Sequence, residues 1–562
     1  MPAPTIQTAA ITTSPARDLS VRAILPWALL ALLLSSGPYL LAWLATPKGQ
    51  VFSGILANHN DFTAYIAAMR QGAAGQWLFH FNFSPNVWQP QLMLPAYILA
   101  GKVLGSFSNN NFLWFNVLRV AALIFTMGAF LVWVRRIFPG RVTTQRVAWL
   151  FLTLGGGLGW LLWPLTASWA VSTSYFPDLS RPEWTTLLIA INPPHYTLGL
   201  GLEVFYFATL PGLARPGQRR RATWQCTLLG LTLALVYVYH IALIGFVTGL
   251  YLLYLAWQAR RIPWRVWLAG SIIILPLMPL LFYYGYWVNR DPAWASYVVS
   301  NLNAIPPPPL LGLLIGFGLL GLLAAAGIRH WWRLGQERLV LLWLAGNLLL
   351  LYLPIVQYAG RFALGIIVPV GTLAAFGLEE VALPWLERTR FYRGFARLTP
   401  TPYASLRRVS VILTVPSGLL VALLLSQSIL TRPGFPTYLP QADVTAANWL
   451  AEQLTADDLV LAYYPIGNYL PAVTPGRVFV GQFFLTSDYE GKLALAEQFW
   501  QTDDAGWQAR FLDEWAITYV FQGTFEQALG PDQAEPPPGR VVYQRDGIII
   551  YQIGDPMGLP GS

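Results

Sequence analysis

Arginines gather at one recurring end of the long apolar segments of this chain, and this one-sided arrangement limits what it can fold into. Four arginines lie in the loop 135–146, four lie in 215–222, and six lie between Arg388 and Arg408. The loops at the opposite ends are longer and poor in basic residues. Because cytoplasmic loops of membrane proteins carry an excess of Lys and Arg, the pattern indicates a multi-pass membrane protein.

Composition excludes an ordinary soluble protein, because 55% of the 562 residues are hydrophobic and only 11% are charged. The net charge of +9 divides into two regions of opposite sign. From residue 431 onward, 6 Lys and Arg stand against 16 Asp and Glu, which gives −10, and the remainder has 29 against 10, which gives +19. The basic residues lie in short loops, where they set orientation and meet anionic lipid headgroups. We therefore expect no nucleic-acid binding. The single cysteine, Cys226, excludes an internal disulfide.

Eleven segments are long and apolar enough to cross a bilayer, which requires about 20 residues of helix. They are 24–46, 112–134, 147–165, 195–213, 223–239, 241–257, 266–287, 309–328, 338–355, 361–382 and 409–429. With the N-terminus inside, eleven crossings place every arginine cluster in the cytoplasm and the acidic tail outside. This count requires 88–105, which two prolines interrupt, to be an interfacial or re-entrant piece of the first outer loop. It also requires a turn near Tyr239-His240.

We therefore expect a mainly α polytopic membrane helix bundle of about 11 transmembrane helices with a C-terminal extracytoplasmic α/β domain. The expected parts are a cytoplasmic tail over 1–23, a transmembrane domain over 24–430 with outer loops 47–111 and 166–194, and a soluble α/β domain over 431–562. In the last part, helices alternate with short β-rich runs, and a hairpin surrounds Asp546-Gly547. That alternation predicts a mostly parallel sheet. The tail contains no glycine-rich phosphate loop, so nucleotide binding has no support.

Asp61 is the most informative polar residue, because it follows the first apolar segment on the expected outer face. Transfer of a sugar to a hydroxyl group needs a carboxylate that takes the hydroxyl proton. The structural alternative is an N-cap, since an apolar helix-forming run begins at Phe62. The two roles do not exclude each other.

The residues around Asp61 resemble the first outer loop of bacterial GT-C-type membrane glycosyltransferases, including mannosyl- and arabinosyltransferases. The likeness comprises Asp61, Tyr65…Met69-Arg70…Gly72…Gly75-Gln76-Trp77, Pro90…Pro95…Gly101, Leu118-Arg119, Asn192-Pro193-Pro194-His195, Gly360-Arg361-Phe362…Pro369 and Asn448-Trp449…Gly476-Arg477. The resemblance implies a polyprenyl-phosphate-sugar donor, inversion at the anomeric carbon, and Asp61 as the catalytic base. Many members carry two acids in this loop, whereas this chain has Asn60-Asp61.

Other polar residues on the expected outer face are candidates for the phosphate side of the reaction. Arg361 is a candidate clamp for a leaving phosphate, with snorkelling to the interface as its alternative. His195 is a second candidate for this side, and a cap of the fourth span is its alternative. Asp178 or Glu183 with His195 would suit a divalent cation such as Mg or Mn, although their spacing is no metal signature.

Two charged residues are expected inside the membrane. Arg119 and Glu203 lie at similar depth, roughly 12 Å below the outer ends of their helices. Because unpaired charges are costly there, we expect the two to pair with each other. The alternative is a role in an acceptor or lipid-phosphate cavity.

These observations predict an inverting hexosyl- or pentosyltransferase in a bacterial plasma membrane. It would move a sugar from a polyprenyl-phosphate carrier to a lipid-linked or cell-envelope acceptor on the outer face. The expected partners are that donor, a lipid or glycan acceptor, and membrane lipids. One alternative is a glycan polymerase or ligase that uses a diphosphate-linked oligosaccharide. Another is a transporter or flippase, which usually shows paired, related halves, and the sequence shows no such repeat.

Overall fold

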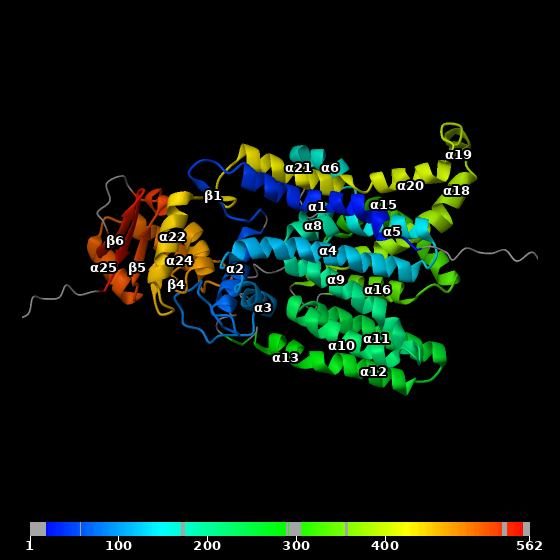
Figure 1. The fold of residues 1–562 in the computed structure, drawn as a ribbon, viewed down its shortest axis with the longest axis horizontal. Coiled ribbons are helices and arrows are strands. Elements are labelled where there is room, and N and C mark those ends of the chain that lie inside the picture. Colours follow the sequence, from blue (N-terminus) through cyan, green and yellow to red (C-terminus); the bar gives the residue numbers. More distant parts are fainter. Residues whose placement is uncertain are drawn as a thin grey trace, which may run out of the picture.

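The computed structural model describes residues 18–56, 58–169, 175–287, 290–291, 305–353, 358–530 and 537–554. Figure 1 shows a long helical bundle that meets a smaller domain of strands and helices at one end. The helices before residue 432 are α1 (Val21–Leu44), α2 (His59–Ala73), α3 (Pro95–Leu104), α4 (Asn111–Ile137), α5 (Val142–Leu154), α6 (Gly159–Trp169), α7 (Pro177–Ser180), α8 (Thr186–Ile191), α9 (Pro194–Thr209), η2 (Leu210–Ala214), α10 (Arg219–Val236), α11 (His240–Ala259), α12 (Trp264–Ile274), η3 (Leu275–Leu277), α13 (Met278–Trp287), α15 (Leu310–Arg333), α16 (Leu339–Tyr352), η4 (Ala359–Ala363), α17 (Ile367–Gly377), η5 (Leu378–Ala382), α18 (Leu383–Glu387), α19 (Arg390–Phe395), α20 (Pro402–Ile412) and α21 (Pro416–Thr431).

Nine helical stretches in the described part of the chain are long and apolar enough to cross a membrane. The chain is therefore a multi-pass membrane protein, as its composition predicts. Two expected spans, 223–239 and 338–355, correspond to α10 and α16 and are not among the nine. Three arginines begin α10, and α16 has only 14 residues. The count of eleven spans and their direction stay predictions.

Two local expectations about the bundle agree with the structure. The segment 88–105 contains α3, which has ten residues and so is about 15 Å long, half the thickness of the hydrocarbon core. It packs on α2 beside the smaller domain instead of running along the bundle (Figure 1). The break expected near Tyr239-His240 is also present, because α10 ends at Val236 and α11 begins at His240.

Helices α2 and α3 pack with their backbones in direct contact, and two glycines make this possible. A Cβ atom on Gly72 would lie 2.0 Å from the carbonyl oxygen of Ile98, and one on Gly101 would lie 1.9 Å from that of Met69. Any larger residue at either position would force the helices apart. The spaced glycines of the first outer loop therefore have a structural role, which fixes the helix that carries Asp61.

The C-terminal part has one five-stranded sheet in the order β4-β3-β5-β7-β6. Its elements are β2 (Tyr438–Pro440), α22 (Gln441–Gln453), β3 (Leu459–Leu461), α23 (Tyr464–Val473), β4 (Arg477–Val478), α24 (Tyr489–Gln501), α25 (Ala505–Glu514), β5 (Tyr519–Gln522), α26 (Thr524–Gln527), β6 (Arg540–Arg545) and β7 (Ile548–Gln552). Strand β3 pairs in parallel with β4 and β5, whereas β7 pairs antiparallel with β5 and β6.

The expectation of a mostly parallel sheet was therefore wrong for half of the strand pairs. Strands β6 and β7 are joined by the tight turn at Asp546-Gly547, and a turn of this length can only connect antiparallel neighbours. The α/β character and the hairpin itself agree with the prediction.

The C-terminal part is held against the segment 47–111 at many points. Strand β1 (Gln50–Phe52) pairs antiparallel with β2. The hydroxyl of Thr63 on α2 donates to the Asn468 side chain at 2.7 Å, and Arg70 Nε donates to the carbonyl of Pro471 at 3.1 Å. Two regions that are almost 400 residues apart in sequence therefore form one continuous body at the end of the bundle.

Candidate active site

Asp61 lies in the first turn of α2. If Asp61 were the N-cap, the helix would begin at Phe62, but it begins three residues earlier, at His59. Asn58 takes the N-cap position with φ of 52°, a left-handed conformation that Asn tolerates better than most residues. The Asn58 side chain donates to Asp61 Oδ2 at 2.8 Å. The capping interpretation of Asp61 was therefore wrong, and its carboxylate is free to face a cavity.

The carboxylate of Asp61 also receives a hydrogen bond from the C-terminal part. Gln482 Nε2, in the segment between β4 and α24, donates to Asp61 Oδ1 at 3.2 Å. Burial raises the pKa of Asp61 above its usual range, while Asn58, the charge of Arg361 and Gln482 each act to lower it. A raised pKa makes this carboxylate a better proton acceptor than an exposed aspartate would be.

Arg361 faces the same cavity from η4. Its Nη1 lies 2.5 Å from Glu183 Oε1, and it also donates to the hydroxyl of Tyr196. Among the described residues, its buried Nε has no hydrogen-bond partner. The guanidinium is thus anchored at one end and keeps one donor for an anionic ligand.

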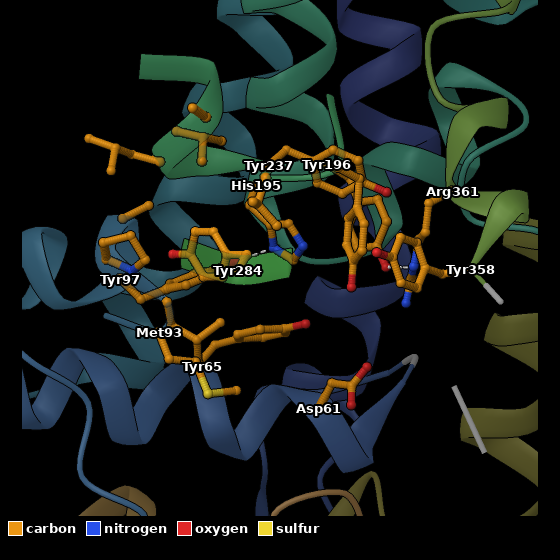
Figure 2. A pocket seen from close by; sticks show the side chains of 18 of the residues that line it. Asp61, Tyr65, Met93, Tyr97, His195, Tyr196, Tyr237, Tyr284, Tyr358 and Arg361 are labelled. Carbon is orange, nitrogen blue, oxygen red and sulfur yellow. Dashed lines mark hydrogen bonds between the residues drawn. The ribbon is translucent and has the colours of Figure 1, made fainter. Parts of the chain in front are cut away.

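Aromatic residues line much of the cavity that these two charged groups share. The hydroxyl of Tyr97 lies 2.6 Å from His195 Nδ1, and the Tyr65 ring stacks on Tyr97 with 4.7 Å between centroids. The Tyr196 and Tyr237 rings lie 5.4 Å apart on the facing side. Figure 2 shows Asp61 below these tyrosines and Arg361 to the right of Tyr196, so that both charged groups lie toward the same side of the cavity.

Asp61, Arg361 and these aromatic residues line a cavity of about 320 Å³. Its lining comes from α2, α3, the start of α9, the break between α10 and α11, α13, η4 and the segment at 482–485. A carboxylate and a guanidinium that face one aromatic cavity can accept a proton and bind an anion in the same place. Aromatic faces additionally suit stacking against the apolar face of a sugar ring.

Three of the candidate site residues predicted from the sequence line this cavity, namely Asp61, His195 and Arg361. Tyr65 and Pro95, which belong to the resemblance, line it as well. Sequence reasoning missed Gln482 and the tyrosines at 196, 237, 239, 284 and 358. The only available signal was the break at Tyr239-His240, which places Tyr237 and Tyr239 at the outer end of two helices. Gln482 lies in a short irregular segment with no recognisable motif.

The two other acidic candidates, Asp178 and Glu183, have structural partners. Glu183 pairs with Arg361, as given above. Asp178 accepts hydrogen bonds from Ser417 Oγ at 2.6 Å and from the backbone of Gly159 at 3.0 Å, and it does not line the cavity. Burial raises the pKa of Asp178 to about 6. No cluster of three or more metal-ligating side chains occurs in the part of the chain that the structure describes.

The expected pairing of Arg119 with Glu203 was wrong. Glu203 Oε2 lies 2.9 Å from His240 Nδ1, and Glu203 Oε1 accepts a hydrogen bond from Trp343 Nε1 at 2.9 Å. Arg119 donates instead to the carbonyls of Ser35 and Ala190. The expectation rested on similar depth in the membrane, but the two helices turn the side chains toward different neighbours.

Comparison with known proteins gives structural matches alone. No family model matches the chain, and no curated protein matches it. The crystal structure of ArnT from Cupriavidus metallidurans bound to undecaprenyl phosphate superposes with a TM-score of 0.50 at 14% identity, covering 94% of this chain and 98% of that one. The arabinofuranosyltransferase AftD from Mycobacteria gives 0.50 at 14% identity, covering 96% of this chain and 40% of that one.

The oligosaccharyltransferase of Archaeoglobus fulgidus, in a complex with Zn and sulfate, gives a lower TM-score of 0.48 at 13% identity. It covers 88% of this chain and 67% of that one. ArnT and AftD, the two matches with a TM-score of 0.50, are glycosyltransferases of the GT-C fold. The resemblance seen in the first outer loop is thus confirmed at the level of architecture, and the chain has the GT-C fold.

Proposed function

We propose that the protein is an inverting glycosyltransferase of a bacterial plasma membrane. It moves a sugar from a polyprenyl-phosphate carrier to a lipid-linked or cell-envelope acceptor on the outer face. The observation that carries the proposal is the placement of Asp61 and Arg361 at one end of a single aromatic cavity. The GT-C fold is consistent with it, because the matching ArnT structure contains undecaprenyl phosphate.

The chemistry assigns one role to each charged group. Asp61 takes the proton of the acceptor hydroxyl as its oxygen attacks the anomeric carbon of the donor sugar. The bond between that carbon and the phosphate oxygen breaks, and the phosphate leaves with the electron pair. Arg361 stabilises the charge that develops on the phosphate, through the Nε donor that is unused in the described structure. Attack opposite to the leaving phosphate inverts the configuration of the carbon.

The apolar part of the same cavity suits the carrier lipid. Leu235 on α10 and Leu281 on α13 both line the cavity, and each side chain is 40% exposed. These helices belong to the membrane bundle, so their exposed side chains face the hydrocarbon. A polyprenyl chain can therefore lie beside them while its phosphate reaches Arg361 and His195.

Replacement of Asp61 by Asn tests the proposal. Asn keeps the size of the side chain and an oxygen that accepts hydrogen bonds, but it cannot take up the proton. In a deletion strain complemented with the Asn variant, mass spectrometry of glycolipids and envelope glycans should show sugar transfer reduced by about a hundredfold or more. Asp504→Asn is the matched control, because Asp504 caps α25 and Asn preserves that function. Full transfer by Asp61→Asn would refute the proposal.

The proposed orientation of the protein in the membrane has its own test. Ser108 and Thr143 are exposed and lie at opposite ends of α4, and the native Cys226 is buried. A cysteine placed at Ser108 should react with an impermeant thiol reagent added outside the cell, and one at Thr143 should not. Labelling of Thr143 from outside would place the C-terminal part in the cytoplasm and contradict transfer on the outer face.

A further inference from the structure

A second and larger cavity, of about 1140 Å³, lies away from the candidate active site between α1 and α4. Figure 1 shows these two helices side by side in the bundle, with β1 and α22 near their outer ends. Residues from all four elements line the cavity, and so does Arg119. Asp61, His195 and Arg361 do not line it.

The walls of this groove are apolar and open toward the surrounding lipid. Leu40 and Trp43 on α1, and Leu113, Val117 and Ile124 on α4, are each more than 40% exposed and line the groove. In a membrane, an apolar groove on the lipid-facing side of two transmembrane helices is filled by acyl chains. Its walls therefore suit the hydrocarbon part of a lipid.

The inner end of the groove carries an uncompensated positive charge. Arg119 is 2% exposed, and none of the ion pairs in the described part of the chain includes it. Its Nη1 is held by the carbonyls of Ser35 and Ala190 at 3.1 and 3.0 Å. Its Nε and Nη2 donate longer hydrogen bonds of 3.4 Å to Asn116 Oδ1 and Ser36 Oγ, and its Cζ lies 3.8 Å from the centroid of the Tyr39 ring. All of these partners are neutral, so no carboxylate among the described residues offsets the charge of Arg119. The two 3.4 Å hydrogen bonds are the weakest of the set, and an anion that entered the groove would replace them.

The depth of Arg119 matches the position of lipid phosphates. It lies sixteen residues from Arg135 at the arginine-rich end of α4, which corresponds to about 24 Å along the helix. The hydrocarbon core is roughly 30 Å thick, so Arg119 lies about 6 Å below its outer boundary. An arginine side chain spans that distance by snorkelling toward the headgroups.

Polar side chains complete the outer rim of the groove. Gln50, Ser53, Asn110, Asn116 and Gln441 all line it and offer amide and hydroxyl groups above Arg119. A headgroup with one negative charge and free hydroxyl groups fits this combination better than a headgroup with a bulky cation, which Arg119 would repel.

We propose that the groove between α1 and α4 binds one anionic phospholipid of the outer leaflet. Its phosphate accepts from Nε and Nη2 of Arg119 in place of Asn116 and Ser36. Its acyl chains lie along Leu113, Val117 and Trp43, and its headgroup contacts the polar rim below α22. The bound lipid joins the membrane bundle to the C-terminal part. This site is separate from the proposed transfer reaction and does not depend on it.

The test is lipid retention by the full-length protein, measured by native mass spectrometry after release from nanodiscs of equal phosphatidylglycerol and phosphatidylcholine. The wild-type protein should retain phosphatidylglycerol in about fivefold excess, the preference that one basic residue near the headgroups confers. Arg119→Gln should lose this preference. Because Arg119→Gln removes buried hydrogen bonds, a second pair of variants tests the groove without touching the charge.

Val117→Trp fills the groove, whereas Val132→Trp places the same bulk on the same helix outside it, and both valines are 43% exposed. Only Val117→Trp should lose the retained lipid. Equal retention of the two phospholipids by the wild type, or equal behaviour of the two Trp variants, would overturn the proposal. In nanodiscs that also contain undecaprenyl phosphate, preferential retention of that carrier in the groove would overturn it as well.

Discussion

The side-chain amide of Gln482 donates a 3.2 Å hydrogen bond to the carboxylate of Asp61, across 421 positions of sequence. The same Gln482 accepts a hydrogen bond from the backbone of Leu485 at 2.7 Å, which fixes its orientation. The C-terminal part therefore contributes a residue to the candidate active site. It supplies one of the groups that set the proton affinity of the candidate base.

Substitution of Gln482 should shift the pH dependence of sugar transfer. The hydrogen bond from Gln482 lowers the pKa of Asp61, so Gln482→Leu should raise that pKa. Because the base must be ionised to act, the acidic limb of the profile of kcat/KM against pH should move to higher pH. Gln482→Glu keeps the acceptor for Leu485 and adds a negative charge, so it should move the limb further in the same direction. An unchanged limb in both variants would show that Asp61 is not the titrating group.

Features of the fold that depend on a local pattern of residues could be predicted from the sequence. Runs of apolar residues predicted a multi-pass helical bundle, although α10 and α16 are not among the nine described stretches that are long and apolar enough to cross a membrane. The break before His240 was visible as a turn inside one long apolar run. The alternation in the tail gave most of its helices and strands. The GT-C resemblance rested on a first outer loop whose glycines, Gly72 and Gly101, turn out to hold α2 against α3.

Features that depend on how distant helices face each other could not be predicted. Matched depth suggested that Arg119 and Glu203 pair, but depth leaves the rotation of each helix about its own axis undetermined. Glu203 faces His240 and Trp343, whereas Arg119 faces the carbonyls of Ser35 and Ala190. Gln482 and the tyrosine wall were missed for a similar reason, since several distant segments converge only in the folded chain.

Substitutions in the ion pair of Arg361 and Glu183 should affect the stability of the protein and its transfer activity differently. Glu183 is almost fully buried, with a side chain 3% exposed. Arg361→Gln leaves that carboxylate unpaired and should lower the free energy of unfolding by about 3 kcal/mol. The double variant Arg361→Gln with Glu183→Gln should recover most of this stability but no transfer activity. Thermal unfolding in detergent and a transfer assay measure the two effects. Activity in the double variant equal to that of the wild type would exclude Arg361 from phosphate binding.

The close contact of α2 with α3 predicts a strong response to one added methyl group. Gly101→Ala places a Cβ atom 1.9 Å from the Met69 carbonyl oxygen, and the resulting displacement should cost about 1–3 kcal/mol of stability. Because α2 carries Asp61, transfer should fall as well. Gly128→Ala in α4 is the control, since nothing lies within 4 Å of its Cβ position. That change should be neutral or stabilising by about 0.5 kcal/mol. Equal unfolding temperatures for the two variants would contradict the contact.

Double-mutant cycles distinguish the observed partner of Glu203 from the one expected from the sequence. The side chains of Glu203 and His240 are both fully buried and 2.9 Å apart, so their Ala substitutions should be strongly coupled, by about 1 kcal/mol or more. Glu203 and Arg119 have no partner in common among the described residues, and their substitutions should be additive within about 0.5 kcal/mol. Equilibrium unfolding in mixed micelles gives the four free energies of each cycle. Strong coupling between Arg119 and Glu203, together with additivity of Glu203 and His240, would restore the pairing suggested by depth. It would also remove the reason for regarding Arg119 as a charge available to a lipid.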